Sequence, residues 1–450
     1  MNSDSKYISL ILIHVVIGFL IYALKPLSKF YFFTALIFFV GSVVVAHKSK
    51  KTTAIMNACA YFIGAEVFFR MTKGGMSYEA SKYLVIFFVV LGMVYKGISD
   101  RGYPYFVYLI LLVPSIVIAS LDLNIDANFR TNLAFVLSGP VCLGLAALFF
   151  FERKVKHKDI VNMLAYMSMP IVTMTTYLMV FNPSVKETIK NTASNYVSSG
   201  GFGPNQVSTI LGLGVFVFTV RLLIKSPTIF LKLFNSFFLV LIAYRAIITF
   251  SRGGVLAAII TIVAFVVIFY AKALPRVKTK IIGSVLVLFM AMIASWFISS
   301  SNTLGLIDKR YANQDSLGRE KADFTTGRVE LVFNELDGFI ENPFFGIGAS
   351  NTKYNREGKE VVTHNELTRL LSEHGVFGIF ILLILIFTPL SYRSENRKNV
   401  FFYAFLAFWF ATINHSAMRI AAPAFFYALA LLDIEYEKHP IRRKRLVAKR

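Results

Sequence analysis

The 450-residue sequence predicts an all-α membrane protein with about 12–14 transmembrane helices and one long, partly helical outer loop. Hydrophobic residues make up 56% of the chain and charged residues 16%, whereas a soluble globular protein carries about 25% charged residues. The apolar residues recur in blocks as long as a bilayer core requires of a helix. Lysine and arginine gather between these blocks, as the loops of membrane proteins require.

Apolar blocks between charged interruptions predict fourteen spans. The first block lacks a small-residue cleavage site and is followed at once by another block, so we interpret it as a helix and not as a signal peptide. The predicted spans are 8–24, 30–46, 53–70, 83–95, 105–121, 132–151, 160–181, 206–220, 233–250, 254–271, 281–300, 375–390, 400–414 and 418–432.

The orientation follows from the basic residues of alternate short loops, because lysine and arginine favour the cytoplasmic side. These residues place both termini in the cytoplasm and the loop 301–374 outside. The expected organisation is a membrane domain over 1–300, the outer loop 301–374, further spans over 375–432 and a basic tail over 433–450.

The formal charge of +22 comes from 47 basic and 25 acidic residues. Most of this excess lies in the loops expected on the cytoplasmic side and in the tail, where it orients the protein and contacts anionic lipid. We therefore expect membrane lipid, and not nucleic acid, as the partner of these charges.

Metal and nucleophile motifs are weak. Cys59 and Cys142 lie inside apolar blocks, and the seven histidines show no metal-binding spacing. The alternative is a metal site at Asp122 and Asp126, which lie on a predicted outer loop and form a weak candidate ligand pair. We expect no metal and no cofactor.

The first polar interruption is the glycine-rich stretch 198–206, where a span begins on the outer side. Its glycines allow a close approach of the backbone to a ligand. Asn205 and Gln206 place donors at a helix N-terminus, which favours anions. The alternative is a flexible loop followed by an ordinary helix cap.

The second interruption surrounds two arginines. Arg245 and Arg252 are seven residues apart, so one continuous helix would present both on the same face. Paired guanidiniums suit a diphosphate, because each binds phosphate oxygens bidentately. The alternative makes Arg252 an interfacial anchor and Arg245 the partner of a buried carboxylate such as Glu66.

The outer loop contains a predicted amphipathic helix over 328–340, lying on the membrane or over a cavity. Its apolar residues recur at helical spacing, and Arg328 lies in its first turn. Thr325 or Thr326 is the expected cap, and the Glu-Asn-Pro stretch beginning at Glu341 is the expected stop.

A second expected helix start lies at Thr363-His364-Asn365-Glu366. Thr363 and Glu366 fit a capping box, which makes Thr363 the N-cap and His364 the first helical residue. The positive end of the helix dipole would keep His364 neutral, as a general base requires. The alternative is a solvated surface histidine.

These motifs, in this order, resemble the O-antigen ligase and O-antigen polymerase superfamily over about 200–380. They are the Ser-Arg-Gly-Gly turn at Ser251, Gly327-Arg328, the Glu-Asn-Pro-x-x-Gly-x-Gly stretch from Glu341, His-Asn-Glu-Leu from His364 and Glu-x-Gly-x-x-Gly from Glu373.

The resemblance implies a GT-C-like glycosyltransferase that works at the periplasmic face of the bacterial inner membrane. The donor would be an undecaprenyl-diphosphate-linked glycan, and catalysis would be metal-independent and inverting. Arg252 and Arg328 would bind the diphosphate, and His364 would take the proton of the acceptor hydroxyl. The resemblance assigns no role to Asn205 and Gln206, and Arg245 enters only through its spacing.

The acceptor remains open between two alternatives. A ligase transfers the glycan to the lipid A core in lipopolysaccharide biosynthesis, whereas an O-antigen or exopolysaccharide polymerase adds it to another lipid-linked repeat. A transporter of lipid-linked oligosaccharides is a further alternative, but transporters commonly carry internal repeats. Here the polar features gather on one predicted face, which favours an enzyme.

Overall fold

A computed structural model of the chain describes residues 3–122, 127–182, 185–325, 327–353, 363–395 and 397–436. Helices dominate, as predicted. They are α1 (Ser3–Ala23), α2 (Leu27–Val45), α3 (Lys51–Thr72), α4 (Ala80–Lys96), α5 (Tyr103–Leu111), α6 (Val113–Asp122), α7 (Ala127–Phe150), α8 (His157–Phe181), α9 (Val185–Thr188), α10 (Pro204–Ile224), α11 (Ile229–Ile247), α12 (Arg252–Lys272), α13 (Pro275–Asn302), α14 (Leu306–Tyr311), α15 (Arg328–Glu341), α16 (Glu366–His374), α17 (Val376–Glu395), α18 (Phe402–Ser416) and α19 (Ala421–Ala430). Short 3-10 helices cover Lys48–Lys50 (η1), Asp100–Gly102 (η2) and Asn351–Lys353 (η3).

Within the described chain, eleven helical stretches are long and apolar enough to cross a membrane, and each coincides with a predicted span. The other three predicted spans correspond to α4, α18 and α19, which have 17, 15 and 10 residues. Ten helical residues extend only about 15 Å, half of a bilayer core. The chain is therefore an all-α, multi-pass membrane protein in which three of the predicted spans correspond to short apolar helices, and α19 is shorter than its predicted span.

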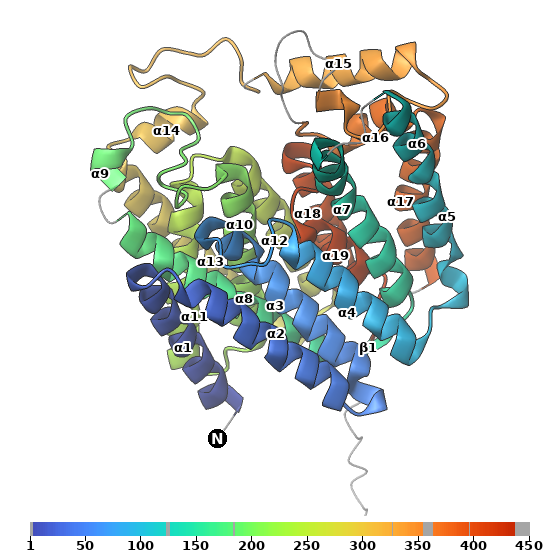
Figure 1. Ribbon diagram of the computed structural model, residues 1–450. Helices are drawn as coiled ribbons and strands as arrows, with labels where there is room; N and C mark the ends of the chain where they lie inside the picture. Colours follow the sequence, from blue (N-terminus) through green and yellow to red (C-terminus); the bar gives the residue numbers. More distant parts are fainter. Residues whose placement is uncertain are drawn as a thin grey trace, which may run out of the picture.

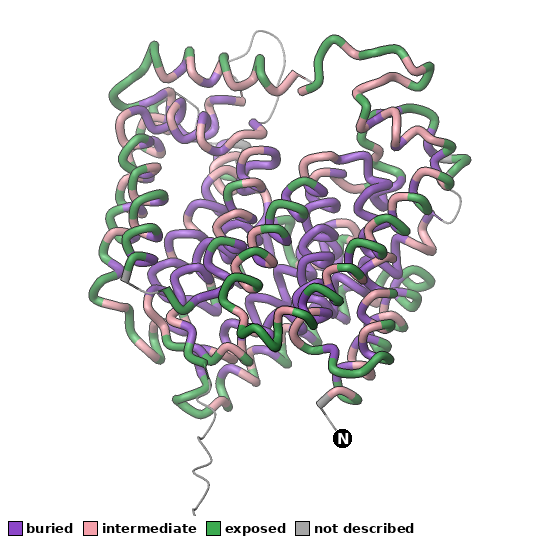
Figure 2. The backbone as a smooth tube through the Cα atoms, turned by 180° about the vertical axis from the view of Figure 1, so that it is seen from behind, coloured by how far each residue is buried: buried purple, intermediate pink, exposed green. Residues whose placement is uncertain are grey.

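Buried residues follow the central helices, and exposed residues lie along the peripheral helices (Figure 2). Many of the exposed residues are large and apolar. Every residue of α19 is buried, as is nearly all of α10. At the periphery, Phe30, Ile37 and Phe297 are each at least 70% exposed. Apolar side chains on such a surface face lipid, which solvates them as the protein interior would.

The outer loop forms a cap over one end of the helices. In Figure 1, α15 lies across the end that also holds α9, α14 and α16, opposite the N-terminus. Helix α15 confirms the predicted amphipathic helix and ends at the predicted stop. Its side toward α16 buries Glu335, whose Oε2 accepts a hydrogen bond from Thr368 Oγ1 at 2.5 Å. Val329 and Phe333 remain exposed.

The expected cap of α15 is wrong. Gly327, with a φ of 79°, is the N-cap residue and no side chain caps the helix. The hydroxyl of Thr325 instead donates to Asp323, and Thr326 lies outside the described residues.

A pair of short strands, β1 (Lys154–Lys156) and β2 (Asp433–Glu435), lies at the opposite end from α15 (Figure 1) and was not predicted. The strands pair in parallel, with Val155 beside Ile434. This pairing holds the loop after α7 and the segment after α19 at one end of the molecule. Most of the basic tail, 437–450, lies outside the described residues.

Candidate active site

Arg252 opens α12 immediately after a turn. Helix α11 ends at Ile247, Phe250 adopts a φ of 59°, and α12 begins at Arg252. The expectation that Arg245 and Arg252 share one helical face is therefore wrong, because the turn places them on two different helices.

Arg245 faces the protein interior. Its side chain is 1% exposed, and its Nη2 donates to the carbonyl of Ser198 at 2.7 Å. The alternative partner Glu66 is also wrong, because Glu66 Oε1 pairs with Arg70 Nη2 at 2.6 Å. Arg245 therefore anchors the glycine-rich loop to α11.

Asn205 and Gln206 lie in the first turn of α10, as predicted, but both make protein contacts. Asn205 Oδ1 accepts a hydrogen bond from Ser251 Oγ at 2.7 Å, which joins α10 to the turn that carries Arg252. Gln206 is buried, and its Oε1 accepts from Arg70 Nη1 at 3.1 Å. Asn205 therefore stabilises the turn before Arg252, and the Gln206 side chain points into the protein interior.

The two glycines after Arg252 allow the start of α12 to pack tightly. A Cβ on Gly254 would lie 2.0 Å from Ser208 Oγ of α10, and a Cβ on Gly253 would lie 2.6 Å from the ring of His415. The Nε2 of His415 lies 3.4 Å from Thr209 Oγ1. Glycine at both positions thus brings Arg252 close to a histidine of α18 that the sequence analysis did not select.

Three guanidiniums gather at this end, from α12, α14 and α15. Arg252 donates to the carbonyl of Phe324, whose ring centroid lies 4.1 Å from the guanidinium carbon. Arg310 and Arg328 interact electrostatically with Arg252, and Arg310 also with Arg328. Burial, and then these two neighbours, lower the pKa of Arg310 to about 10. Burial and Arg252 likewise lower the pKa of Arg328.

The three arginines share one further property. Within the part of the chain that the structure describes, none of them has a carboxylate oxygen at ion-pair distance. Like charges that are partly removed from water repel strongly, and an anion relieves that repulsion. We therefore define Arg252, Arg310 and Arg328 as the arginine cluster, a candidate site for a multiply charged anion.

His364 does not lie on a helix, and it is linked to this cluster through His415, which interacts electrostatically with both His364 and Arg328. Asn365 is the N-cap of α16, its Oδ1 accepting from Leu367 N at 2.9 Å, and the helix begins at Glu366. The predicted capping box is thus wrong, because Glu366 turns inward to pair with Arg369. The dipole of α16 therefore acts on His364 from a greater distance than the capping box implied.

The backbone around His364 is held by the turn between α18 and α19. The carbonyl of His364 accepts from Ala417 N at 3.2 Å, and the carbonyl of Thr363 accepts from Arg419 Nη2 at 2.6 Å. His364, Arg328 and Arg419 all interact electrostatically with His415. This places the candidate base, the arginine cluster and the end of α18 in one region.

A buried network of charges fixes the turn itself. Ala421 N donates to Glu66 Oε2 at 2.7 Å, and Arg70 Nη1 donates to the carbonyl of Arg419 at 2.9 Å. Arg70 also pairs with Glu66 and Glu79, each within 3 Å. Helices α3 and α4 thereby support the segment that carries His364.

Sequence reasoning missed Arg310, His415 and Arg419. His415 and Arg419 interrupt the last two apolar blocks, and an ionisable residue in a membrane segment is a functional signal in itself. Arg310 gives no such signal, because it is one of several basic residues in the outer loop.

The remaining glycine motifs form a joint between the loop and α16. Gly346 has a φ of 71°, and a Cβ there would lie 2.5 Å from the carbonyl carbon of Glu373. Gly375 has a φ of 58° and would meet the nitrogen of Gly346 at 2.6 Å. The Ile347 N–H donates to the carbonyl of Ser372 at 2.9 Å. Both motifs therefore serve a backbone-to-backbone contact that positions α16.

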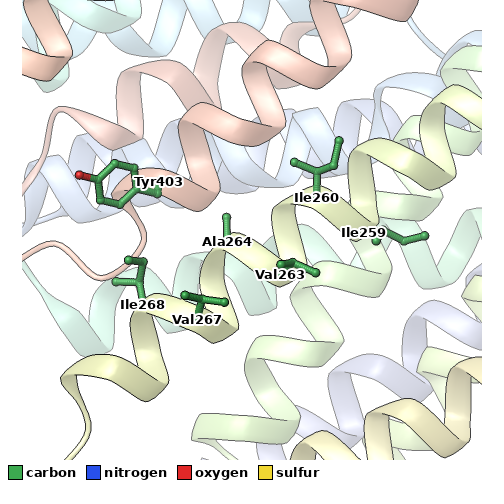
Figure 3. Close-up of a pocket in the computed structure, with 7 residues that line it drawn as sticks. All are labelled: Ile259, Ile260, Val263, Ala264, Val267, Ile268 and Tyr403. Atoms are coloured by element: carbon green, nitrogen blue, oxygen red, sulfur yellow. The ribbon is translucent and has the colours of Figure 1, made fainter.

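An apolar groove of about 470 Å³ runs along the helix that Arg252 opens (Figure 3). One wall comes from α12 and the other from Tyr403 of α18. The residues that line it are Ile259, Ile260, Val263, Ala264, Val267, Ile268 and Tyr403. At 1.5 Å per residue, the groove begins roughly 10 Å along α12 from Arg252.

A metal site does not emerge from the described residues, which hold no group of three or more His, Cys, Asp or Glu side chains placed to bind an ion. The side chains of Asp122 and Asp126, the alternative metal ligands, lie outside the described part of the chain.

Comparison with known proteins gives one family match. Residues 237–383 match the family model described as O-antigen ligase. The match covers less than half of the chain but includes Arg252, Arg310, Arg328 and His364, whereas His415 and Arg419 lie beyond it. No curated protein matches the chain.

Proposed function

We propose that this chain, whose residues 237–383 match the O-antigen ligase family model, is a ligase-type glycosyltransferase. It would transfer a glycan from an undecaprenyl-diphosphate-linked donor to a sugar hydroxyl of the lipid A core, at the periplasmic face of the inner membrane. The observation that carries the proposal is the arginine cluster beside His364, at the loop-covered end of a membrane protein.

The chemistry needs two groups. The acceptor oxygen forms a bond to the anomeric carbon while the bond from that carbon to the diphosphate breaks, with inversion at the carbon. His364 takes the proton of the acceptor hydroxyl as general base. Arg252 and Arg328 stabilise the negative charge that develops on the leaving diphosphate, as fixed cations do without a metal ion.

The groove on α12 supports a lipid-linked donor. A ligand whose anionic head binds at Arg252 can extend an apolar chain along the same helix, where only apolar residues and Tyr403 line the wall. A nucleotide sugar offers no such chain. We therefore place the prenyl chain of the donor in this groove.

The polymerase alternative uses the same donor and the same chemistry. The family match covers both activities, and only the acceptor differs: another lipid-linked repeat replaces the lipid A core. We favour the ligase because the His and Arg motifs of this chain resemble those of ligases.

A transfer assay with purified protein tests the proposal. Protein in detergent receives a lipid-linked repeat unit, with or without lipid A core, and the products are resolved on a gel. A shifted product that needs the lipid A core supports a ligase, and a ladder from donor alone supports a polymerase. Absence of both products with an active donor preparation contradicts a glycosyltransferase.

A further inference from the structure

Arg310 differs from two other buried arginines, Arg70 and Arg369. Arg70 and Arg369 each pair with two carboxylates, Glu66 and Glu79 for the first and Glu366 and Glu373 for the second. Arg310 is also buried, at 8% exposure. It interacts electrostatically with the cations Arg252 and Arg328 and with Tyr311, whereas the Asp323 carboxylate interacts with Arg252.

The fold holds Arg310 in this unfavourable position by specific contacts. Its Nε donates to the carbonyl of Phe250 at 3.2 Å, in the same turn that presents Arg252. The short helix α14 is fixed by a hydrogen bond from Ser300 to Asp308 and by Tyr311, whose ring packs on Trp296 with centroids 4.9 Å apart. Arg310 is therefore built into the cluster and not placed there by chance rotation of a surface side chain.

We propose that Arg310 is a third substrate-binding guanidinium, which contacts the diphosphate of the donor together with Arg252 and Arg328. This inference rests on the proposed function for the identity of the ligand. Each non-bridging oxygen of a diphosphate can accept more than one hydrogen bond, so two bidentate guanidiniums leave acceptor positions for a third. A third cation increases the charge that can be stabilised as the leaving group departs.

The two cationic neighbours of Arg310 are what separate this role from a structural one. Arg245 is also buried without a carboxylate at ion-pair distance in the described chain, but its electrostatic neighbour is Tyr244 and it anchors the glycine-rich loop. Removal of a buried arginine that is paired with a carboxylate leaves that carboxylate without a partner. Removal of Arg310 would instead relieve repulsion in the ligand-free protein. Loss of function together with unchanged or increased stability is typical of a residue retained for binding.

The test compares Arg310→Gln, Arg310→Lys and the control Arg319→Gln. Arg319 lies in the same outer loop but is exposed and paired with Asp315. The unfolding midpoint of the purified protein is measured with increasing inorganic pyrophosphate, with sulfate as the anion control. A ligand that binds only the folded state raises this midpoint.

We expect pyrophosphate to raise the midpoint of the wild type and of Arg319→Gln, and to raise that of Arg310→Gln much less. The midpoint of ligand-free Arg310→Gln should equal or exceed that of the wild type. In the transfer assay, KM for the lipid-linked donor should rise about 10- to 100-fold, as for a lost charged hydrogen bond, with KM for the acceptor unchanged.

Three results would overturn the assignment. The first is a wild type that does not respond to pyrophosphate. The second is a lowered ligand-free midpoint in both Arg310 variants with the pyrophosphate response retained, which makes the residue structural. The third is that the Arg310 variants lose a midpoint shift caused by phosphatidylglycerol vesicles but keep the shift caused by pyrophosphate. That result would assign a lipid headgroup to Arg310 instead. If Arg310→Gln loses the pyrophosphate response and the wild type shows no transferase activity, the anion site is supported and the proposed function is contradicted.

Discussion

His364 is positioned by its backbone neighbours, and its half-buried imidazole interacts electrostatically with His415. Contacts from Ala417 and Arg419 hold the main chain at 363 and 364, and they do not depend on the side chain of residue 364. Replacement of the His364 side chain should therefore leave these backbone contacts in place, so that a mutation tests the chemistry of the imidazole alone.

We predict that His364→Ala lowers the transfer rate by about 100- to 10,000-fold, the usual contribution of a general base, and leaves expression and donor binding intact. The control is His47→Ala, an exposed histidine near η1. Transfer by purified protein and donor binding are the measurements. Loss of folding in His364→Ala would return this residue to a structural role.

Arg252 makes a stacked and a hydrogen-bonded contact with one residue, Phe324. A lysine keeps the charge but loses the planar fork. We therefore predict that Arg252→Lys reduces transfer nearly as much as Arg252→Ala, whereas Arg319→Lys remains active. A fully active Arg252→Lys enzyme would show that charge alone is sufficient at this position.

At the scale of elements, the loop and α16 are joined by glycines whose backbones are in contact. We predict that Gly346→Ala lowers the unfolding midpoint more than Gly318→Ala does. Both positions have a positive φ, 71° and 88°, which costs about 1–2 kcal/mol for alanine. Only Gly346 also faces backbone at 2.5 Å, whereas Gly318 has no atom within 4 Å. Equal decreases of the unfolding midpoint in the two variants would mean that the loop and α16 can move apart at Gly346 without loss of stability.

The groove along α12 gives a second prediction at this scale. Ala264→Phe adds a ring to the groove and should raise KM for a donor with a long prenyl chain more than for a short-chain analogue. Leu256→Phe, on an exposed position of the same helix outside the groove, is the matched control. Equal changes for both donors would place the prenyl chain elsewhere.

At the scale of the whole molecule, the orientation in the membrane is the prediction to test. The native Cys59 and Cys142 are buried, so an introduced cysteine reports its own position. We expect a membrane-impermeant maleimide to label Ser316→Cys, in the outer loop, on intact spheroplasts. Ser49→Cys, near η1, should react only after lysis. The reverse pattern would invert the topology and contradict a periplasmic site.

The sequence determined the features that depend on local pattern. Eleven spans and the amphipathic helix from Arg328 follow from block length and periodicity. A bilayer imposes these patterns on each segment separately, because every span must satisfy its own backbone hydrogen bonds. The choice of Arg252, Arg328 and His364 comes from their sequence motifs and the family resemblance, and their chemical roles stay predictions.

Only the tertiary structure decided which polar groups meet. It moved Arg245 to the interior, replaced the capping box at Thr363 by an Asn365 cap, and brought Arg310 and His415 to the cluster from distant segments. Spacing along the chain cannot show these contacts, because a turn at Phe250 and the close packing at Gly253 and Gly254 set the distances between helices. The partners of a buried charge are chosen by long-range packing, and a single sequence records that choice only indirectly.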